Sequence, residues 1–192
     1  KNELGDKNGA LEDYALTVEW NKKNADAYYY SGVIKFEQKK YEEAKADFLQ
    51  LVDKTIQSVT TFDNSIIGLE PKKCVFRINR DVRFSKDKSP YKNNMGASFN
   101  KGGKKVQNAG YYLHVEAGKS FLGGGLYMPM PPDLNKIRQE IDYNFTEFKK
   151  IVDSESFKKV FTNIEHIYRL LLQVLYVAFA YIIYKYDWTY IS

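Results

Sequence analysis

The hydrophobic pattern of this chain changes its period once, and that change limits the fold more than any other feature. Apolar residues first recur at helical spacing, at Tyr41, Ala44, Phe48, Leu51, Val52 and Ile56. The spacing breaks at residues 62–71, where Asp, Asn, Gly and Pro gather. Beyond the break, apolar residues alternate with the period of two that is typical of strands. A helix followed by strands predicts an α+β fold.

The strands are expected to form an antiparallel meander of three or four. The first, "VFRINRDVRF", would place Phe76, Ile78, Arg80, Val82 and Phe84 on one face. The next two are "MGASFN" and "AGYYLHVE", joined by a hairpin turn at Gly102 and Gly103. A second turn, "AGK", leads into "SFLGGGLYM". The sheet is therefore expected to follow the helices directly in the chain.

Two helices are expected after the meander. Pro131 and Pro132 suit the first turn of a helix. Its apolar stripe would comprise Leu134, Ile137, Ile141, Phe145, Phe148 and Ile151. The second helix begins near residue 155, with Asp153 or Ser154 as its cap.

The first fifty residues contain a spacing of 34. Ala10 and Ala44 are 34 residues apart, and so are Tyr14 and Phe48. Together with Gly32, this pattern resembles a tetratricopeptide repeat, in which small residues stand where two antiparallel helices touch. The resemblance implies one full repeat plus the second helix of an earlier one, with an array expected further upstream. The alternative is a generic helical hairpin, because such motifs are loose.

Two positions depart from the repeat pattern. Lys22 occupies the position of the usual closing Pro, and Lys39 the position of the usual Gly at the turn.

The middle of the chain resembles an uncharacterised family, domain of unknown function 2461, from about Tyr41 to Phe161. Long ordered blocks carry the resemblance: "YEEAKADF", "GLEPKKCVFRINRDVRFSKDKSPYKNNMGASF", "GKKVQNAGYYLHVEAGKSFLGGGLYMPMPPDLNKIRQEID" and "FKKIV". The resemblance implies a compact α+β domain and no particular reaction. We therefore expect helical repeats over residues 1–52, an α+β domain over 41–165 that shares the last repeat helix, and an apolar tail over 166–192.

The segment from Arg77 to Lys92 is the candidate binding site. Half of its sixteen residues are charged, and six of those are basic. Arginine and lysine side chains in this density suit the oxygens of phosphates and carboxylates. The predicted ligand-binding residues are Arg77, Arg80, Arg83, Lys86, Lys88, Tyr91 and Lys92. The alternative is a solvated face whose charges pair with Asp81 and Asp87.

Arg80 differs from the other cations of this segment, because it would share a face with apolar residues. A buried arginine needs a partner, and Glu116, Glu140 and Asp142 are the candidates. The alternative is a bulge that turns Arg80 outward.

Three functions compete at this stage. The leading hypothesis is a binding protein, in which helical repeats contact a protein partner and the basic segment holds an anionic small molecule. The second is an enzyme acting on a phosphorylated or carboxylated substrate, with Asp81, Asp87, His114 or Glu116 as acid or base. The third is nucleic-acid binding, which the net charge of +5 and sixteen tyrosines allow but no recognition motif supports.

No cofactor and no metal site are expected. Cys74 is the single cysteine, which excludes an internal disulfide and a cysteine-based zinc site. The two histidines, His114 and His166, are far apart and form no His-based metal motif.

The location of the protein is expected to be cytoplasmic, because no secretory signal is seen in the sequence. The alternative is a membrane anchor in the tail, where residues 170–184 carry no charge. Two other interpretations of the tail remain open: a buried element of the core, or an out-of-frame ending.

Overall fold

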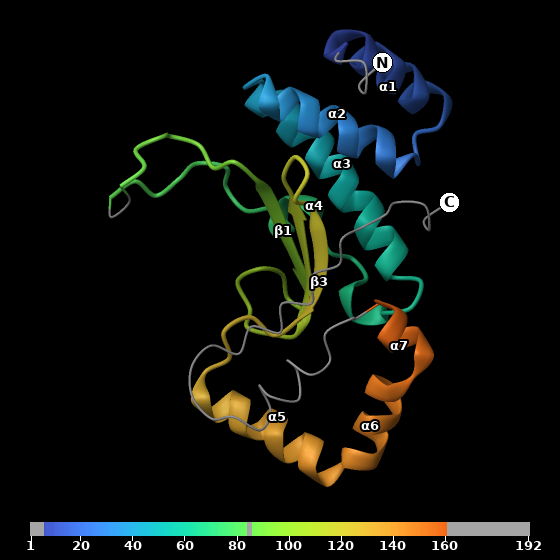
Figure 1. Cartoon of the computed structure of the whole chain (residues 1–192), viewed down its shortest axis with the longest axis vertical. Coiled ribbons are helices and arrows are strands. Elements are labelled where there is room, and N and C mark those ends of the chain that lie inside the picture. The colour runs from blue at the N-terminus through green and yellow to red at the C-terminus, as the bar shows by residue number, and fades with distance from the viewer. Residues whose placement is uncertain (1–5, 84–85, 161–192) are drawn as a thin grey trace.

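The computed structural model describes residues 6–83 and 86–160. Three long helices come first, then a short helical connection, a three-stranded sheet and three further helices (Figure 1). In chain order the elements are α1 (Lys7–Trp20), α2 (Ala25–Glu37), α3 (Tyr41–Val59), η1 (Asn64–Ile66), α4 (Pro71–Cys74), β1 (Met95–Asn100), β2 (Gly110–Val115), β3 (Phe121–Gly125), α5 (Pro131–Tyr143), α6 (Phe145–Asp153) and α7 (Glu155–Val160). The predicted α+β class is confirmed.

The helices α1, α2 and α3 pack side by side, and short polar residues begin two of them. The carboxylate of Asp6 accepts from the backbone N–H of Gly9, and the Asn24 amide oxygen accepts from that of Ala27. A Cβ atom at Gly32 would lie 3.4 Å from the Cβ of Asp47, so a small residue is needed where α2 and α3 touch. The turn between these helices places Lys39 at a φ of 62°, a conformation that favours glycine.

The sheet is antiparallel with strand order β1–β2–β3. Its register pairs Met95 with Val115 and Leu113 with Leu122. Gly102 and Gly103 lie in the β1–β2 connection at φ values of 99° and 78°. The predicted hairpin and its turn glycines are confirmed.

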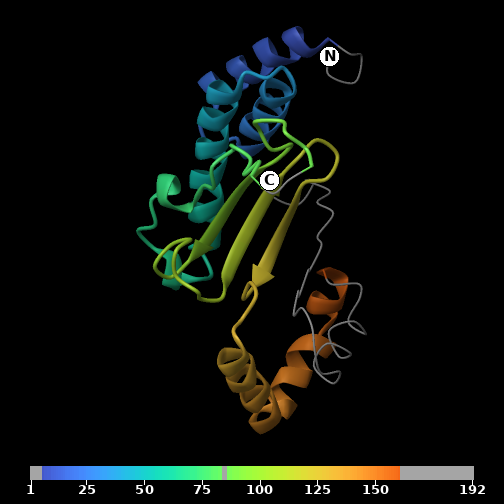
Figure 2. The same cartoon turned by 90° about the vertical axis from the view of Figure 1, so that its left-hand side faces the viewer.

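One face of the sheet packs against α3 and forms the core (Figure 2). The buried side chains on the helix side are Ala44, Phe48, Leu51, Val52, Ile56 and Val59, and those on the sheet are Met95, Ala97, Phe99, Leu113 and Val115. The helical spacing of the first set and the alternation of the second are those expected from the sequence. The opposite face of the sheet carries the candidate site.

The predicted strand at 75–84 is wrong. Only isolated bridges form there, from Val75 to Ala97 and from Asn79 to Tyr91. Val75 and Ile78 are the buried residues and Phe76 is 38% exposed, so the buried positions are three apart rather than two. Past this point the chain leaves the sheet and extends as a long projection, the green loop in Figure 1. We call its described residues, 77–83 and 86–92, the arm.

The predicted single stripe from Leu134 to Ile151 is interrupted. Pro131 and Pro132 begin α5 as expected, but α5 ends at Tyr143 and α6 starts at Phe145. No residue of α5 is buried. Both views show α5 and α6 away from the core between α3 and the sheet (Figures 1 and 2).

The cap predicted for the last helix is confirmed at Ser154. Its hydroxyl accepts from the backbone N–H of Phe157 at the start of α7. The apolar tail at 166–192 lies outside the described residues. Within the described ranges, no helix combines the length and hydropathy needed to cross a membrane.

Candidate functional site on the polar face of the sheet

Strand β2 places a polar cluster on the face of the sheet that points away from α3. Leu113 and Val115 face the core, so Tyr112 and His114 must face the other way. Gly96 of β1 and Phe121 of β3 lie directly opposite His114 in the register. We call the surface formed by Phe76, Gly96, Tyr112, His114 and Phe121 the polar face.

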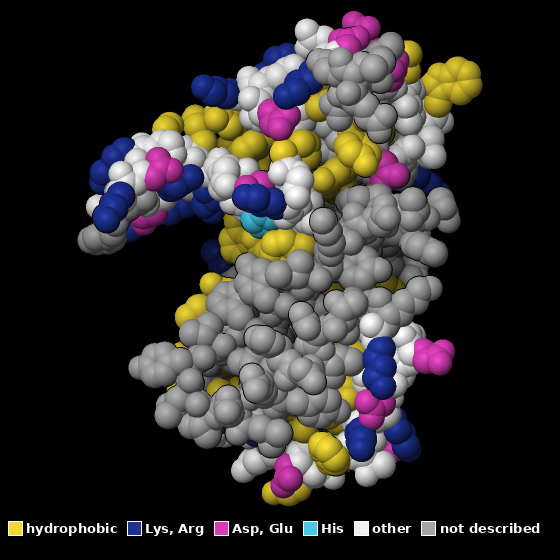
Figure 3. Space-filling model, viewed as in Figure 1, with side chains coloured by type: hydrophobic (Ala, Val, Ile, Leu, Met, Phe, Trp, Pro, Cys, Tyr) yellow, Lys and Arg dark blue, Asp and Glu magenta, His cyan; other side chains and the backbone are white. Residues whose placement is uncertain are grey.

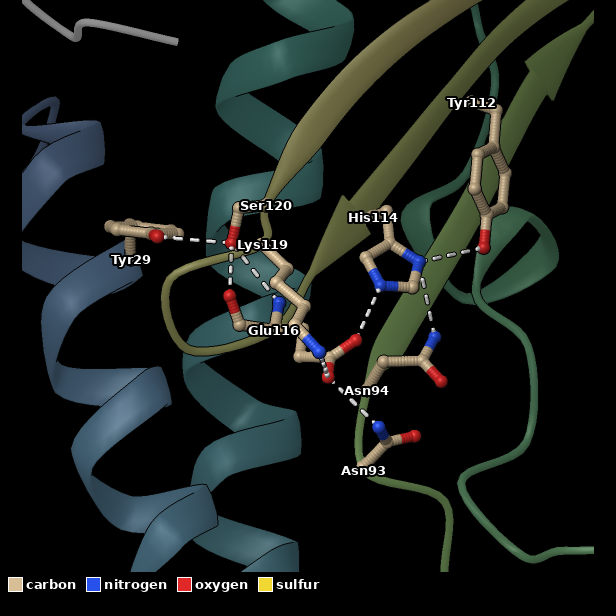
Figure 4. Close-up of polar contacts among 8 residues, drawn as sticks. All are labelled: Tyr29, Asn93, Asn94, Tyr112, His114, Glu116, Lys119 and Ser120. Atoms are coloured by element: carbon tan, nitrogen blue, oxygen red, sulfur yellow. Dashed lines mark hydrogen bonds and ion pairs between the residues drawn. The ribbon is translucent and has the colours of Figure 1, made fainter. Parts of the chain in front are cut away.

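His114 is the centre of this cluster, and both of its ring nitrogens have partners (Figure 4). Nε2 lies 3.1 Å from Oε2 of Glu116, and Nδ1 lies 3.3 Å from the amide nitrogen of Asn94. An amide nitrogen can only donate, so Nδ1 is assigned as the acceptor. The neutral imidazole therefore carries its proton on Nε2 and donates it to Glu116.

Glu116 is held from its other oxygen. Oε1 accepts a 2.8 Å hydrogen bond from the side-chain amide of Asn93 and lies 3.9 Å from Nζ of Lys119. The side chains of His114 and Glu116 are only 16% and 18% exposed. A carboxylate fixed by a neutral donor and a cation, with little contact to water, orients the imidazole firmly.

Tyr112 approaches the second nitrogen of His114. Its hydroxyl lies 3.4 Å from Nδ1, a long contact for an O–H donor. Glycine makes room for this hydroxyl, because a Cβ atom on Gly96 would lie 2.8 Å from it. The sequence thus reserves space for the Tyr112 hydroxyl beside the imidazole.

Aromatic rings surround the cluster. Phe121 stacks on His114 with ring centroids 4.8 Å apart, and Phe76 lies 6.3 Å from the ring of Tyr112. Nζ of Lys104 lies 5.7 Å from the centre of the Phe76 ring. In Figure 3 the one histidine of the described residues lies at the surface between charged side chains and a hydrophobic area. The polar face therefore combines rings with an acid–base pair.

Two arginines of the arm pair within the arm. Arg80 contacts Asp87 at 2.6 Å, and Arg83 forms a two-pronged contact with Asp81. The expected partners of Arg80, Glu116, Glu140 and Asp142, are therefore wrong. The pairing occurs because the arm leaves the sheet, which brings the carboxylates of one loop closer than those of the domain.

The remaining predicted residues occupy the two ends of the arm. Lys88 donates to the carbonyl oxygen of Val82, and Lys86 is exposed near the tip. Lys92 donates to the carbonyl oxygen of Arg77 at 3.0 Å. Tyr91 packs on Tyr41 of α3, with centroids 4.1 Å apart, and so fixes the arm to the helices.

Contacts within the arm shift the pKa values of several of its own side chains. The Arg83 guanidinium lowers the pKa of Asp81, and the backbone N–H of Ser89 lowers the pKa of Asp87. The pKa of Lys92 is lowered by burial and by the nearby charge of Arg77. Two cations are therefore held close together where the arm meets the sheet.

A third cation, Lys104, contacts the chain close to Arg77 in sequence. Its ammonium donates to the carbonyl oxygen of Val75, two residues before Arg77. We call Arg77, Lys92 and Lys104 the foot of the arm. Lys104 was not among the residues predicted from sequence, because the β1–β2 connection that brings it there has no regular pattern.

Asn93 and Asn94 were also missed. Asn93 and Asn94 precede β1 and reach His114 and Glu116 only through the strand register. The hairpin at Gly102 and Gly103 could have supplied that register. The spacing of Tyr112, His114 and Glu116, by contrast, was visible in the sequence.

No group of three or more His, Cys, Asp or Glu side chains suited to a metal ion is found in the described ranges. Cys74 is fully buried, and burial raises the pKa of its thiol, which disfavours the reactive thiolate.

Comparison with known proteins gives one match. A model of the family described as "Conserved hypothetical protein (DUF2461)" matches residues 20–171. No curated protein and no solved structure matches the chain. The match extends from the end of α1 through the sheet, the arm and the helices that follow. It thus contains the polar face and the foot of the arm, and it assigns neither of them a role. On this match, the chain belongs to the family of conserved hypothetical proteins designated DUF2461.

Proposed function

We propose that this protein binds an anionic small molecule at the foot of the arm, beside the polar face. The observation that carries the proposal is the position of Lys92, whose ammonium donates at 3.0 Å to the carbonyl oxygen of Arg77; burial, and to a lesser degree the charge of Arg77, lowers the pKa of Lys92. Like charges held together destabilise a site unless an anion lies between them. A phosphate or carboxylate is the group that would relieve this repulsion.

The cations at the foot have further N–H donors that a ligand could engage. A lysine ammonium carries three N–H donors, and Lys92 and Lys104 each use one on a carbonyl oxygen. Within residues 6–83 and 86–160, the guanidinium of Arg77 has no hydrogen bond or ion pair to another side chain. The guanidinium groups of Arg80 and Arg83, by contrast, already form ion pairs with Asp87 and Asp81.

Thermal shift with inorganic pyrophosphate tests the proposal. The melting temperature of the parent protein is expected to rise with ligand, because binding to the folded state alone stabilises it. A double variant, Arg77→Gln with Lys92→Gln, should lose most of this shift. Each lost charge-assisted hydrogen bond is worth on the order of 1.5–3 kcal/mol.

A matched control separates a site from general attraction. Lys22→Gln with Lys149→Gln removes the same charge from exposed positions away from the arm. This control should keep the full shift. Equal losses in the two double variants would contradict a site at the foot. A shift given by a single-stranded oligonucleotide and not by pyrophosphate would favour nucleic-acid binding instead.

A second part of the proposal assigns the helices to contact with a protein partner. Trp20 and Leu16 on α1 are 90% and 56% exposed, which is unusual for large apolar side chains. Tryptophan is also the residue most enriched at the centres of interfaces. Leu16→Ser keeps Trp20 as the reporter; it should leave pyrophosphate binding unchanged and abolish capture of a protein partner, measured as a shift in Trp20 fluorescence. Unchanged capture would contradict this part.

A further inference from the structure

The polar cluster around His114 is not explained by anion binding alone. We propose that Tyr112, His114 and Glu116 form a proton relay that activates the Tyr112 hydroxyl for acid–base catalysis. The relay runs from the Tyr112 hydroxyl through the His114 imidazole to the Glu116 carboxylate. The hydroxyl lies 3.4 Å from Nδ1, and Nε2 lies 3.1 Å from Oε2 of Glu116. Tyr112 and His114 are alternate residues of β2 and Glu116 is the first residue after the strand, so the strand fixes their order.

The direction of the hydrogen bonds suits proton removal from Tyr112. Nδ1 of His114 is the basic nitrogen, because Nε2 donates to Glu116. The proton of the Tyr112 hydroxyl moves to Nδ1, which leaves a phenolate and an imidazolium. Glu116 stabilises the imidazolium through the proton on Nε2, and the reverse transfer restores both neutral groups. No other reactant is needed for this step.

Asn94 competes with Tyr112 for the same nitrogen. Nδ1 has one lone pair, and the Asn94 amide lies 3.3 Å away, about as far as the Tyr112 hydroxyl. Neither contact has the length of a strong hydrogen bond. Catalytic contacts are often long before substrate binds and shorten in the complex. The two long contacts are therefore those expected of a relay before substrate binds.

The surroundings favour a reactive rather than a structural hydroxyl. Gly96 leaves the space that the hydroxyl occupies, and the stacked ring of Phe121 restrains the imidazole. Asn93 and Lys119 hold the far oxygen of Glu116, so the carboxylate cannot turn away from His114.

The adjacent residue on the same strand provides a contrast. The hydroxyl of Tyr111 donates to Asp63 at 3.0 Å, and burial together with this bond raises its pKa. Tyr111 is therefore held in its neutral form. Tyr112 has an imidazole base where Tyr111 has a carboxylate partner.

The substrate class follows from the foot of the arm, and this step alone rests on the proposed function. The Phe76 ring lies between Lys104 and Tyr112, so an anionic group at the foot would place the rest of a small molecule over that ring. We expect a phosphorylated or carboxylated small molecule that exchanges a proton with the Tyr112 hydroxyl.

An aryl sulfonyl fluoride tests the relay without any substrate. The phenol oxygen attacks sulfur, the S–F bond breaks, fluoride leaves and the phenol proton goes to His114. Tyr112 should be labelled faster than Tyr111, as measured by peptide mass spectrometry over time. His114→Phe keeps a ring against Phe121 and should slow the labelling of Tyr112 on the order of 100-fold, the lower end for acid–base catalysis. Labelling of Tyr111 should not change.

Glu116→Gln tests the positioning residue. It keeps an acceptor for Nε2 but removes the charge, so labelling of Tyr112 should fall about tenfold, within the range expected for a charged partner. Equal labelling of Tyr112 in the parent and in His114→Phe would overturn the relay, provided that both proteins melt at the same temperature. If His114→Phe fails to fold, Glu116→Gln decides, and an unchanged rate there would overturn the relay. Loss of pyrophosphate binding with intact labelling would overturn only the substrate class.

Discussion

The two faces of strand β2 carry side chains of very different character. On one face Leu113 and Val115 are 5% and 2% exposed and pack on α3. On the other, Tyr112 and His114 lie among polar partners and rings. The period of two makes this separation possible within six residues. The face that packs on α3 therefore contributes to stability, and the opposite face carries the ionisable groups proposed for acid–base chemistry.

The largest expected difference lies between a core residue and a polar-face residue. Phe48→Ala removes a fully buried ring and should lower the free energy of unfolding by about 3–5 kcal/mol. Tyr112→Phe removes the long hydrogen bond to His114 and should lower the free energy of unfolding by about 0.5–1.5 kcal/mol. Urea denaturation of both variants measures the difference. Similar losses would show that the polar face is part of the core.

Two glycines of the sheet are expected to differ in how well they tolerate a side chain. A Cβ atom on Gly110 would collide with the carbonyl oxygen of Phe99 and the Cβ of Asn100, so Gly110→Ala should destabilise the fold by about 1–3 kcal/mol. A Cβ atom on Gly96 meets only the movable end of Tyr112, so Gly96→Ala should be milder in urea denaturation. The same substitution should also displace the hydroxyl and slow sulfonyl fluoride labelling of Tyr112. A Gly96→Ala protein that labels normally would argue against the assigned role of this space.

The pH dependence of stability probes Tyr111. Burial and Asp63 raise its pKa above the ordinary value of 10.0. A raised pKa in the folded state gives stability that is complete below pH 10 and is lost as the pH rises through the folded pKa. Tyr111→Phe should therefore be less stable than the parent at pH 7, by about 1 kcal/mol, and the gap should shrink above pH 10. Unfolding free energies at both pH values test this, and a gap that widens would contradict it.

The smallest expected effect lies in the arm. Arg80 is 27% exposed and its partner Asp87 is 54% exposed, so the pair resembles a surface salt bridge. Arg80→Ala should cost at most about 1 kcal/mol in denaturant. The larger loss expected of a buried arginine would apply only if Arg80 faced the core, and a loss above about 3 kcal/mol would indicate that it does.

Regular periodicity decided which parts of the fold could be predicted. The α3 stripe and the alternation of β2 follow from spacing, whereas β1 and β3 follow from the glycine turns that flank them. The segment at 75–84 imitates a strand by composition, but the chain there makes only two bridges and buries Val75 and Ile78. Two of its cations, Arg80 and Arg83, instead pair with Asp87 and Asp81 of the same loop.

The site could be predicted only in part for a related reason. The spacing of Tyr112, His114 and Glu116 is local, so it was visible in the sequence. The contributions of Asn93, Asn94 and Lys104 depend on strand register and on the course of a long connection. The basic segment pointed to the correct region, although only Arg77 and Lys92 of its predicted residues belong to the foot of the arm.

A nuclear magnetic resonance titration of the arginine side chains with inorganic pyrophosphate would locate an anion at the foot of the arm. The guanidinium signal of Arg77 is expected to shift, since within the described ranges no side chain forms a hydrogen bond or ion pair with it and Asp81 interacts with it only through its charge. The signals of Arg80 and Arg83 should not shift, because their guanidinium groups are already paired with Asp87 and Asp81. Shifts at Arg80 and Arg83 with none at Arg77 would contradict an anion site at the foot of the arm.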